Sequence, residues 1–184
     1  MIDGTTLGGI YDRHSHELFV YICGFTRDPQ AAEDLLHDAF ERLIRYSMKY
    51  PLDLENVRAF LYRTARNLCI DRSRRRPERE AAVLSENHPS ADGGPHDELE
   101  KRELREKISA LVDAKDPLSR SVYLMRTELE QPYEEIAAAL GISVRTAKRK
   151  MQAMLEYLAD SLEKYGYMIL LLILLALLAA SFVL

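Results

Sequence analysis

The chain has 184 residues, of which 47% are hydrophobic and 29% are charged, and its formal net charge is −4. The length allows one or two small domains, and the hydrophobic content excludes a chain that is disordered throughout. Cys23 and Cys69 lie inside apolar helical patterns without a C-x-x-C spacing, which argues against a disulfide framework or a zinc site and favours free thiols. Only eight Gly and seven Pro occur, and Ala, Leu, Arg and Glu dominate, so we predict an all-α fold.

Helical periodicity predicts three helices in the first part of the chain. Apolar side chains at spacings of three and four define a first helix over about 10–26. Asp28 and Pro29 form a typical helix start, with Asp as N-cap and Pro at the first helical position. The second helix, with an apolar stripe and a charged opposite face, runs to a loop over 49–56. A third helix follows over about 57–74 and ends in a run of arginines.

The second part of the chain starts after a stretch of poor periodicity over 77–96, which is rich in Pro and Gly and is typical of a flexible linker. Helices then resume, and a short amphipathic helix is predicted over 133–140. Gly141 suits the left-handed position after that helix, and Ser143 suits the N-cap of the next. The last helix of this part is expected over about 144–165.

The C-terminal residues 167–184 read YMILLLILLALLAASFVL and contain no charge. As a helix they would span roughly 27 Å, about one hydrocarbon core. This pattern favours a transmembrane helix, and the alternative is an apolar helix packed on a partner. Lys164 precedes the segment and no charge follows it, which agrees with a cytoplasmic N-terminal side. We therefore expect a single-pass C-terminal anchor that holds the chain on the cytoplasmic face of the cell membrane.

The segment 133–158 has the pattern of a helix-turn-helix, because a short helix and a Gly-containing turn precede a longer helix. One face of the longer helix is apolar, and the other carries donors that suit phosphates and purine acceptors in a major groove. The alternative is a surface helix with solvated charges. The predicted DNA-binding residues of this segment are Ser143, Arg145, Thr146, Lys148, Arg149 and Gln152.

Besides the basic face of the helix-turn-helix, the sequence has a second basic region, although the net charge of the whole chain is negative. Seven arginines lie between Arg63 and Arg79, with only Asp71 and Glu78 against them. Local basic patches on a mildly acidic chain are typical of a protein that contacts nucleic acid at chosen places. The alternative is a solvated helix end whose cations interact favourably with the helix dipole.

The later motifs carry a family resemblance. PLSRSVYL at 117–124, YEEIA at 133–137, LGIS at 140–143 and TAK at 146–148 resemble region four of extracytoplasmic-function (ECF) sigma factors. Region four recognises the upstream, minus-thirty-five promoter element. Many repressors share similar helix-turn-helix strings, so this part alone leaves the family open.

The N-terminal half extends the resemblance. AEDLLHDAF at 32–40 resembles the region-two helix that binds the clamp of RNA polymerase, and RAFLYRTARN at 58–67 resembles the helix that reads and melts the minus-ten element. The resemblance implies minus-ten contacts by Arg63, Arg66, Asn67, Arg74 and Arg75. It implies polymerase contacts by Asp34, Leu35, Asp38 and Phe40, although Leu35 and Phe40 fit core positions equally well. The loop 49–56 would accept an unstacked base of the melted strand.

The predicted organisation is a region-two helical bundle over 1–76, a linker over 77–96, a region-four helix-turn-helix domain over 97–165 and a transmembrane helix over 167–184. The resemblance implies core RNA polymerase and promoter DNA as partners, with an anti-sigma factor as a further one. The apolar C-terminal segment 167–184 adds the cell membrane to these expected partners. The predicted function is that of an alternative sigma factor that directs promoter-specific transcription initiation while tethered to the membrane.

Two other functions compete with this interpretation. A membrane-anchored one-component regulator would account for the helix-turn-helix and the tail, but not for the N-terminal helices. A membrane adaptor that uses its helices only for protein contacts would not bind DNA. His14 and His16 form an H-x-H pair, with His37 elsewhere, but no carboxylate or Cys cluster joins them as metal ligands. The chain has no nucleophile–base pair and no P-loop, so we expect neither a metal, a cofactor nor an enzyme activity.

Overall fold

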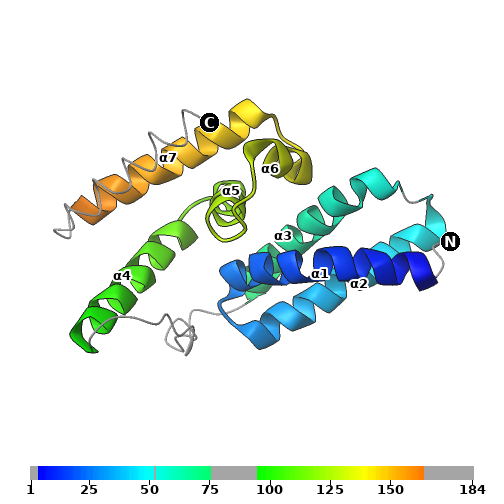
Figure 1. Cartoon of the computed structure of the whole chain (residues 1–184), viewed down its shortest axis with the longest axis horizontal. Helices are drawn as coiled ribbons and strands as arrows, with labels where there is room; N and C mark the ends of the chain where they lie inside the picture. Colours follow the sequence, from blue (N-terminus) through cyan, green and yellow to red (C-terminus); the bar gives the residue numbers. More distant parts are fainter. Residues whose placement is uncertain (1–3, 52, 76–94, 164–184) are drawn as a thin grey trace. The chain divides into compact units, whose positions relative to one another are not determined.

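The computed structural model describes residues 4–51, 53–75 and 95–163, and all regular structure in these ranges is helical (Figure 1). The helices in chain order are α1 (Gly4–Thr26), α2 (Pro29–Lys49), the 3₁₀ turn η1 (Leu54–Asn56), α3 (Val57–Arg75), α4 (Pro95–Asp113), α5 (Pro117–Thr127), α6 (Tyr133–Leu140) and α7 (Val144–Glu163). The predicted all-α character is confirmed for this part of the chain.

The membrane prediction requires a correction. None of the described helices is long and apolar enough to cross a membrane. The physical reason is that the long helices are amphipathic: even α1 carries Asp12, Arg13 and Glu17 in its middle turns. The segment 167–184, on which the prediction rested, lies outside the described residues. The predicted fold with a transmembrane helix and the predicted single-pass location at the membrane are therefore not supported.

Local chemistry explains the bounds of α2. Asp28 has extended backbone angles, and its side chain accepts a hydrogen bond from the Ala31 N–H at 3.1 Å, which satisfies one of the free donors at the helix start. Pro29 occupies the first turn, where its missing N–H costs nothing. The helix ends where Tyr50 turns to an extended conformation before Pro51.

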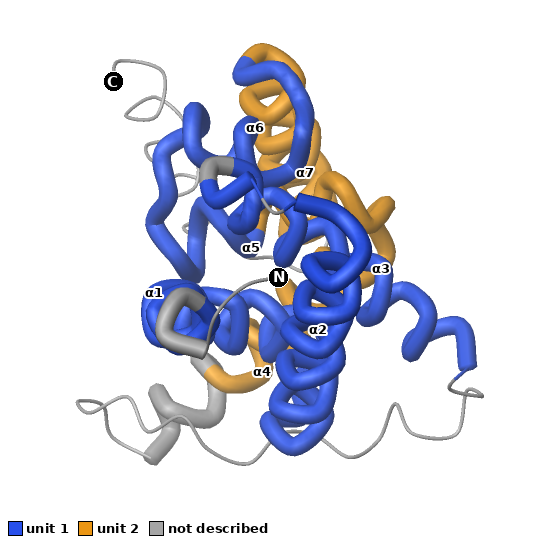
Figure 2. The backbone as a smooth tube through the Cα atoms, turned by 90° about the vertical axis from the view of Figure 1, so that its right-hand side faces the viewer, with its two compact units in different colours: residues 1–86, 124–144 blue, residues 87–123, 145–184 orange. Residues whose placement is uncertain are grey.

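The described chain divides into two compact units, which Figure 2 shows in different colours. Among the described residues, the first comprises 4–51, 53–75 and 124–144, and the second comprises 95–123 and 145–163. The division falls inside α5, so that its last four residues, 124–127, and all of α6 belong with the N-terminal helices.

In the first unit α1, α2 and α3 pack against one another, and α6 packs on α3 (Figure 1). The core of this unit includes four side chains that are each at most 1% exposed: Leu18 and Ile22 of α1, Leu43 of α2 and Leu61 of α3. Burying one such side chain contributes about 1.5–3 kcal/mol. The Tyr21 ring lies against two other aromatic rings, Phe25 at 5.2 Å and Tyr62 at 5.0 Å between centroids.

A close approach of two segments explains the glycine near the end of α1. A Cβ atom placed on Gly24 would lie 2.7 Å from Cδ2 of Leu124, which is closer than real side chains approach. Leu124 lies in α5, a hundred residues further along the chain, and is buried. Glycine at position 24 therefore leaves room for the end of the Leu124 side chain against α1.

In the second unit α4 and α7 share a small core. Val112 of α4 is buried with Met154 and Leu158 of α7, and Ile108 and Leu111 pack against them. At the end of α4, the Lys115 ammonium lies 3.3 Å from the centre of the Tyr157 ring, and Arg120 pairs with Asp113 at 2.6 Å. The amphipathic pattern of α7 thus buries one stripe and leaves the other face in water.

Candidate nucleic-acid interface

The turn between α6 and α7 has the geometry that the sequence predicts. Gly141 adopts the left-handed conformation, with φ of 68° and ψ of 40°. The following Ile142 N–H donates to the Ala137 carbonyl at 3.0 Å, which closes the end of α6 in the manner of a Schellman cap. A residue with a Cβ would be strained at position 141. The connection from Leu140 to Val144 is therefore short and fixed.

The polar face of α7 begins directly after this turn. Arg145, Lys148, Arg149 and Gln152 are exposed, and each has another of them three or four residues away, so that they share one side of the helix. Thr146 is half-buried and Ser143 is exposed before the first turn. The buried stripe on the other side consists of Ala147, Met151, Met154, Leu155, Leu158 and Leu162.

The electrostatics of this face favour an anion. The first N–H groups of a helix lack internal acceptors, and the helix dipole adds positive potential at the same end. Arg145, Lys148 and Arg149 add three cationic side chains within the first two turns. The face can therefore bind phosphates, while Gln152, whose amide donates to Glu156 at 2.9 Å, is held by an acid on its own helix.

The basic end of α3 forms a second exposed face. Arg63, Asn67 and Arg74 are exposed and fall on one side of the helix, since they are four and seven residues apart. Arg75 is exposed and Arg66 half-buried on the flanks. The predicted minus-ten residues are thus available to solvent.

Not every arginine of this helix serves that face. The Arg72 guanidinium lies 3.7 Å from the Asp28 carboxylate, the residue that caps α2. Arg58, at the other end of α3, pairs with Glu17 and Glu135. Both have structural partners within the first unit.

The predicted polymerase-binding residues on α2 differ in their exposure to solvent. Asp34 and Asp38 are exposed on the charged face, whereas Leu35 is 6% and Phe40 is 5% exposed. The Phe40 ring packs on Tyr11 of α1, at 4.8 Å between centroids. The structure therefore places Leu35 and Phe40 in the core, the alternative that the sequence left open for them.

An aromatic cluster beside the loop 49–56 was not singled out by the sequence. The Tyr46 ring lies 5.0 Å from that of Tyr50 and 5.1 Å from that of Phe60. Tyr50 is 55% exposed, and Met48 and Leu54 nearby are more exposed still. The signal was present, because Tyr46 and Tyr50 stand four residues apart at the end of an amphipathic helix.

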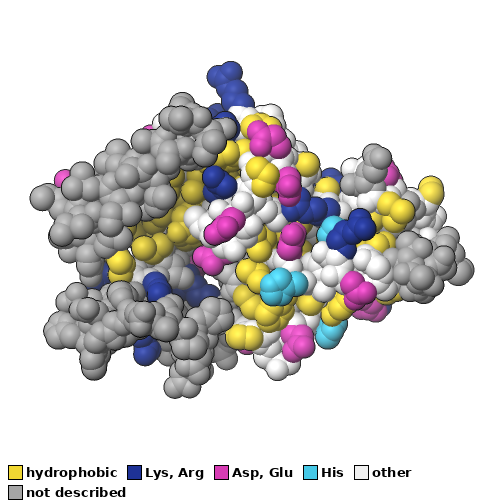
Figure 3. Space-filling model, viewed as in Figure 1, with side chains coloured by type: hydrophobic (Ala, Val, Ile, Leu, Met, Phe, Trp, Pro, Cys, Tyr) yellow, Lys and Arg dark blue, Asp and Glu magenta, His cyan; other side chains and the backbone are white. Residues whose placement is uncertain are grey.

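One face of the molecule carries mixed charges among its described residues. On the face drawn in Figure 3, basic, acidic and hydrophobic side chains are interspersed rather than gathered into one field of a single sign. Within the described ranges no group of three or more His, Cys, Asp or Glu residues is placed to hold a metal ion. The histidines of α1 and α2 therefore form no metal centre with other described residues.

Comparison with known families gives two matches in chain order. The family described as Sigma-70 region 2 matches residues 10–78, and that described as Sigma-70, region 4 matches residues 105–158. The chain belongs to the sigma-70 family. The exposed face of α3 and the acidic face of α2 lie in the region 2 match, and the polar face of α7 lies in the region 4 match.

Curated relatives point to one branch of this family. The chain is 26% identical over 158 residues to the ECF RNA polymerase sigma factor SigE of Mycolicibacterium smegmatis. The aligned segment covers 84% of this chain and 60% of that protein. It is also 26% identical over 129 residues to the probable ECF RNA polymerase sigma factor SigI of Mycobacterium tuberculosis. That alignment covers 66% of this chain and 43% of SigI. The chain therefore spans about half the length of these relatives.

Proposed function

We propose that the chain is an ECF-type sigma factor that binds core RNA polymerase and directs promoter-specific initiation of transcription. One observation carries the proposal: an exposed basic helix face lies in each of the two segments that match sigma-70 regions. Sigma factors are not enzymes, and we propose no reaction of the chain's own. The organisation that goes with this function is region 2 over 1–76, a linker over 77–96 and region 4 over 97–165.

The α7 face would read the upstream element. Its cations and Gln152 emerge from the first turns of the second helix of a helix-turn-helix, the part that enters a major groove in such motifs. Arginine can pair with guanine in two hydrogen bonds, and each such pair is worth about 1–3 kcal/mol of discrimination. Arg145, nearest the start of α7, is the best placed for a base, and Lys148 and Arg149 suit phosphates.

The α3 face would hold the minus-ten element, and the aromatic cluster would take up a base of the melted strand. Arg63, Arg74 and Arg75 supply charge for phosphates, and Asn67 has the amide that pairs with adenine. Stacking of one base on an aromatic side chain is worth about 1–3 kcal/mol. Tyr50, exposed beside Tyr46 and Phe60, offers such a ring.

The acidic face of α2 would bind core RNA polymerase. Asp34 and Asp38 are exposed one turn apart and offer carboxylates to a basic partner surface. Leu35 and Phe40 hold that helix in place from the core side. The predicted polymerase site is thus carried by the two carboxylates.

Initiation assays with core polymerase test the function directly. The full chain should enable core enzyme to start at a specific promoter, whereas a one-component regulator would leave core enzyme inactive. Asp34→Asn with Asp38→Asn should weaken binding to core polymerase. Asp160→Asn, on the exposed C-terminal part of α7, is a matched control outside the proposed surfaces and should have no effect.

Salt dependence and base preference separate the two DNA faces. Arg74→Ala with Arg75→Ala should weaken promoter binding by the holoenzyme and flatten its salt slope by about one to two units. Arg145→Ala should change preference at one upstream base pair. Arg102→Ala, which removes an exposed arginine on α4 that pairs with Glu106 one turn away, is the matched control for both. An unchanged slope and an unchanged preference would contradict the assignments.

Premelted DNA isolates the role of the aromatic cluster. Tyr50→Ala should reduce opening of duplex promoter by about 5- to 150-fold, because a lost stacking contact is worth about 1–3 kcal/mol. On a template with a premelted bubble the variant should lose much less. Equal loss on both templates would assign Tyr50 to folding or polymerase contact instead.

A further inference from the structure

One hydrogen bond on the exposed face of α7 joins the proposed DNA-binding residues to an acidic side chain. The Gln152 amide donates to the Glu156 carboxylate at 2.9 Å, and both side chains are exposed to solvent. The two residues are four apart, so Glu156 lies one helical turn further along the same side of α7. Glu156 is also the first acidic residue of this helix. The hydrogen bond therefore lies where the basic face of α7 ends.

DNA affinity does not explain a carboxylate at this place. Lys148 and Arg149 attract phosphates, whereas a carboxylate beside them repels phosphates. Helix stability is a weak reason too, because a hydrogen-bonded pair one turn apart on an exposed helix surface adds little. What the carboxylate does change is the state of the Gln152 side chain.

The Glu156 carboxylate determines which end of the Gln152 amide points toward it. A carboxylate has only acceptor atoms, whereas an amide has a donor nitrogen and an acceptor oxygen. The hydrogen bond therefore turns Nε2 of Gln152 toward Glu156 and directs the amide oxygen away from that carboxylate. Since this bond uses one N–H, the amide keeps its oxygen and its second N–H for a further partner.

These two groups match one base edge of the major groove. Adenine presents the N7 acceptor beside the N6 donor, and a glutamine can bind both at once. Guanine offers two acceptors, cytosine a donor and thymine an acceptor, so adenine alone uses both groups of the amide. Gln152 lies roughly 10 Å along the helix axis from Arg145, a distance of about three base pairs. An adenine bound by Gln152 would thus lie close to the base bound by Arg145.

We propose that Glu156 is a positioning residue, which holds the Gln152 amide in the orientation that binds one adenine of the upstream promoter element. The inference rests on the proposed function, to which it adds a second base-reading residue and the residue that orients it. Holding a side chain in its bound orientation reduces the entropy lost on binding. Glu156 therefore increases discrimination between bases without contacting DNA itself.

Binding of the holoenzyme to promoters randomised in the upstream element measures this discrimination base by base. The full chain is used with core polymerase. Gln152→Ala should lower the preference for one adenine about tenfold, because a base pair bound through two hydrogen bonds gives discrimination of that order. Glu156→Ala should lower it about threefold at the same position, because the amide is then free to turn. Asp160→Ala removes an exposed acid one turn further along and should leave the preference unchanged.

Two further comparisons separate orientation from charge. In the Gln152→Ala background, Glu156→Ala should cause no further loss of base preference, because Glu156 acts through Gln152. Glu156→Lys replaces an acceptor by a donor, so the amide should reverse and the preference should move from adenine toward guanine, whose edge has two acceptors. Asp160→Lys makes the same charge change and should strengthen binding to all sequences alike.

The wild-type holoenzyme separates failure of this inference from failure of the proposed function. If the wild type selects an upstream element, the inference alone is overturned by any of three results. These are an unchanged adenine preference in Gln152→Ala or Glu156→Ala, an effect of Glu156→Ala that persists without Gln152, and equal shifts in base preference for Glu156→Lys and Asp160→Lys. If the wild-type chain gives core polymerase no preference for any promoter sequence, the proposed function fails and the inference fails with it.

Discussion

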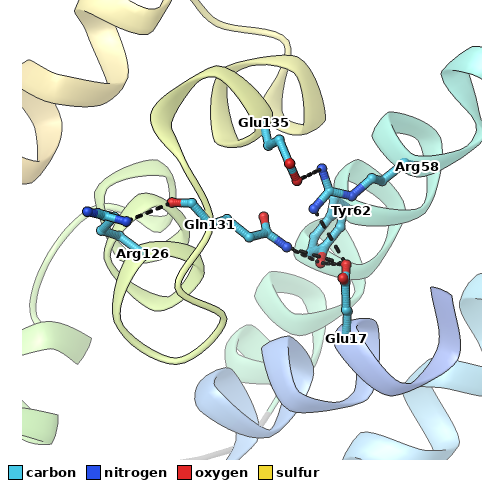
Figure 4. A network of polar contacts seen from close by, with 6 residues as sticks. All are labelled: Glu17, Arg58, Tyr62, Arg126, Gln131 and Glu135. Atoms are coloured by element: carbon cyan, nitrogen blue, oxygen red, sulfur yellow. Dashed lines mark hydrogen bonds and ion pairs between the residues drawn. The ribbon is translucent and has the colours of Figure 1, made fainter. Parts of the chain in front are cut away.

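Each unit contains a cluster of hydrogen-bonded side chains, one buried and one exposed to water. In the first unit the Tyr62 hydroxyl and the Gln131 amide are buried, and they hydrogen-bond to each other and to Glu17 (Figure 4). In the second unit Asp116 caps α5 by accepting from the Ser119 N–H at 3.0 Å and its hydroxyl at 2.6 Å, and Lys150 of α7 lies 3.1 Å away. This Asp116 cap is exposed to water.

The pKa values follow from this difference. Burial, with Glu17 beside it, raises the pKa of Tyr62 to about 12, although the bond from Gln131 acts in the other direction. For Asp116 partial burial acts to raise the pKa, but the hydrogen bonds from Ser119 and the Lys150 ammonium outweigh it and bring the pKa to about 2. A buried site thus favours the neutral form, and a capped, exposed site favours the charged form.

The largest effect is expected from removing the buried hydroxyl. Tyr62→Phe should lower the free energy of unfolding by about 2 kcal/mol, because the buried Gln131 amide loses a hydrogen-bond partner that water cannot readily replace. Urea unfolding of the full chain measures this. Tyr11→Phe removes a hydroxyl from a tyrosine that is 37% exposed and should cost less than about 0.5 kcal/mol. Equal losses would erase the contrast between buried and exposed hydroxyls.

Alkaline pH should act on the same hydroxyl. A raised folded pKa means that the stabilisation is fully present below the unfolded value near 10 and is lost as the pH rises toward 12. By pH 11 the wild type should have lost about 1 kcal/mol more than Tyr62→Phe does over the same range. Unfolding of both proteins at pH 9 and 11 gives the difference. Parallel curves would mean that Tyr62 titrates as an ordinary exposed phenol.

The Asp116 cap should give a smaller change. Asp116→Ala should lower stability by about 1 kcal/mol through loss of the N-cap, while Asp116→Asn keeps an acceptor and should lose less. Its lowered pKa means that the charge contribution is present above the unfolded value of 3.8 and is lost as the pH falls toward 2. Denaturation at pH 7 and pH 3 checks both. A greater loss for Asn than for Ala would contradict capping.

The smallest effect belongs to the ion pair of that cap. Lys150→Met should change stability by less than about 0.5 kcal/mol, because an exposed pair gains little in water and is screened by salt. The difference between variant and wild type should shrink further at about 1 M salt, where screening acts within about 3 Å. A loss as large as that of Tyr62→Phe would show that exposure does not separate the two clusters.

Capping residues and apolar periodicity were enough to predict the bounds of most helices. Asp28 and Pro29 predicted the start of α2, and Gly141 predicted both the end of α6 and its left-handed cap. The start of α1 was missed, because the helix continues back through Gly8 and Gly9 to Gly4, where no apolar period marks it. Caps and periodicity are properties of a few adjacent residues, which is why they can be read without the fold.

Burial within an apolar stripe was only partly predictable. Leu35 and Phe40 fitted a polymerase-facing or a core position, and the packing of α1 on α2 decided for the core. The aromatic cluster needed the approach of Phe60 on α3 to the end of α2, which no spacing along the chain states. The exposed donors on α7 and α3 were predicted, and their roles stay proposals.

The sequence by itself determined where most helix ends lie, which faces are charged and that two sigma-70 segments follow one another, because each depends on neighbouring residues. Only the tertiary structure decided that α6 packs on α3 and that Tyr62, Gln131 and Glu17 meet. Such contacts join residues that lie far apart in the chain, and they depend on shape as well as residue type. A missing side chain at Gly24 and a leucine at position 124 become complementary only when their helices are brought together.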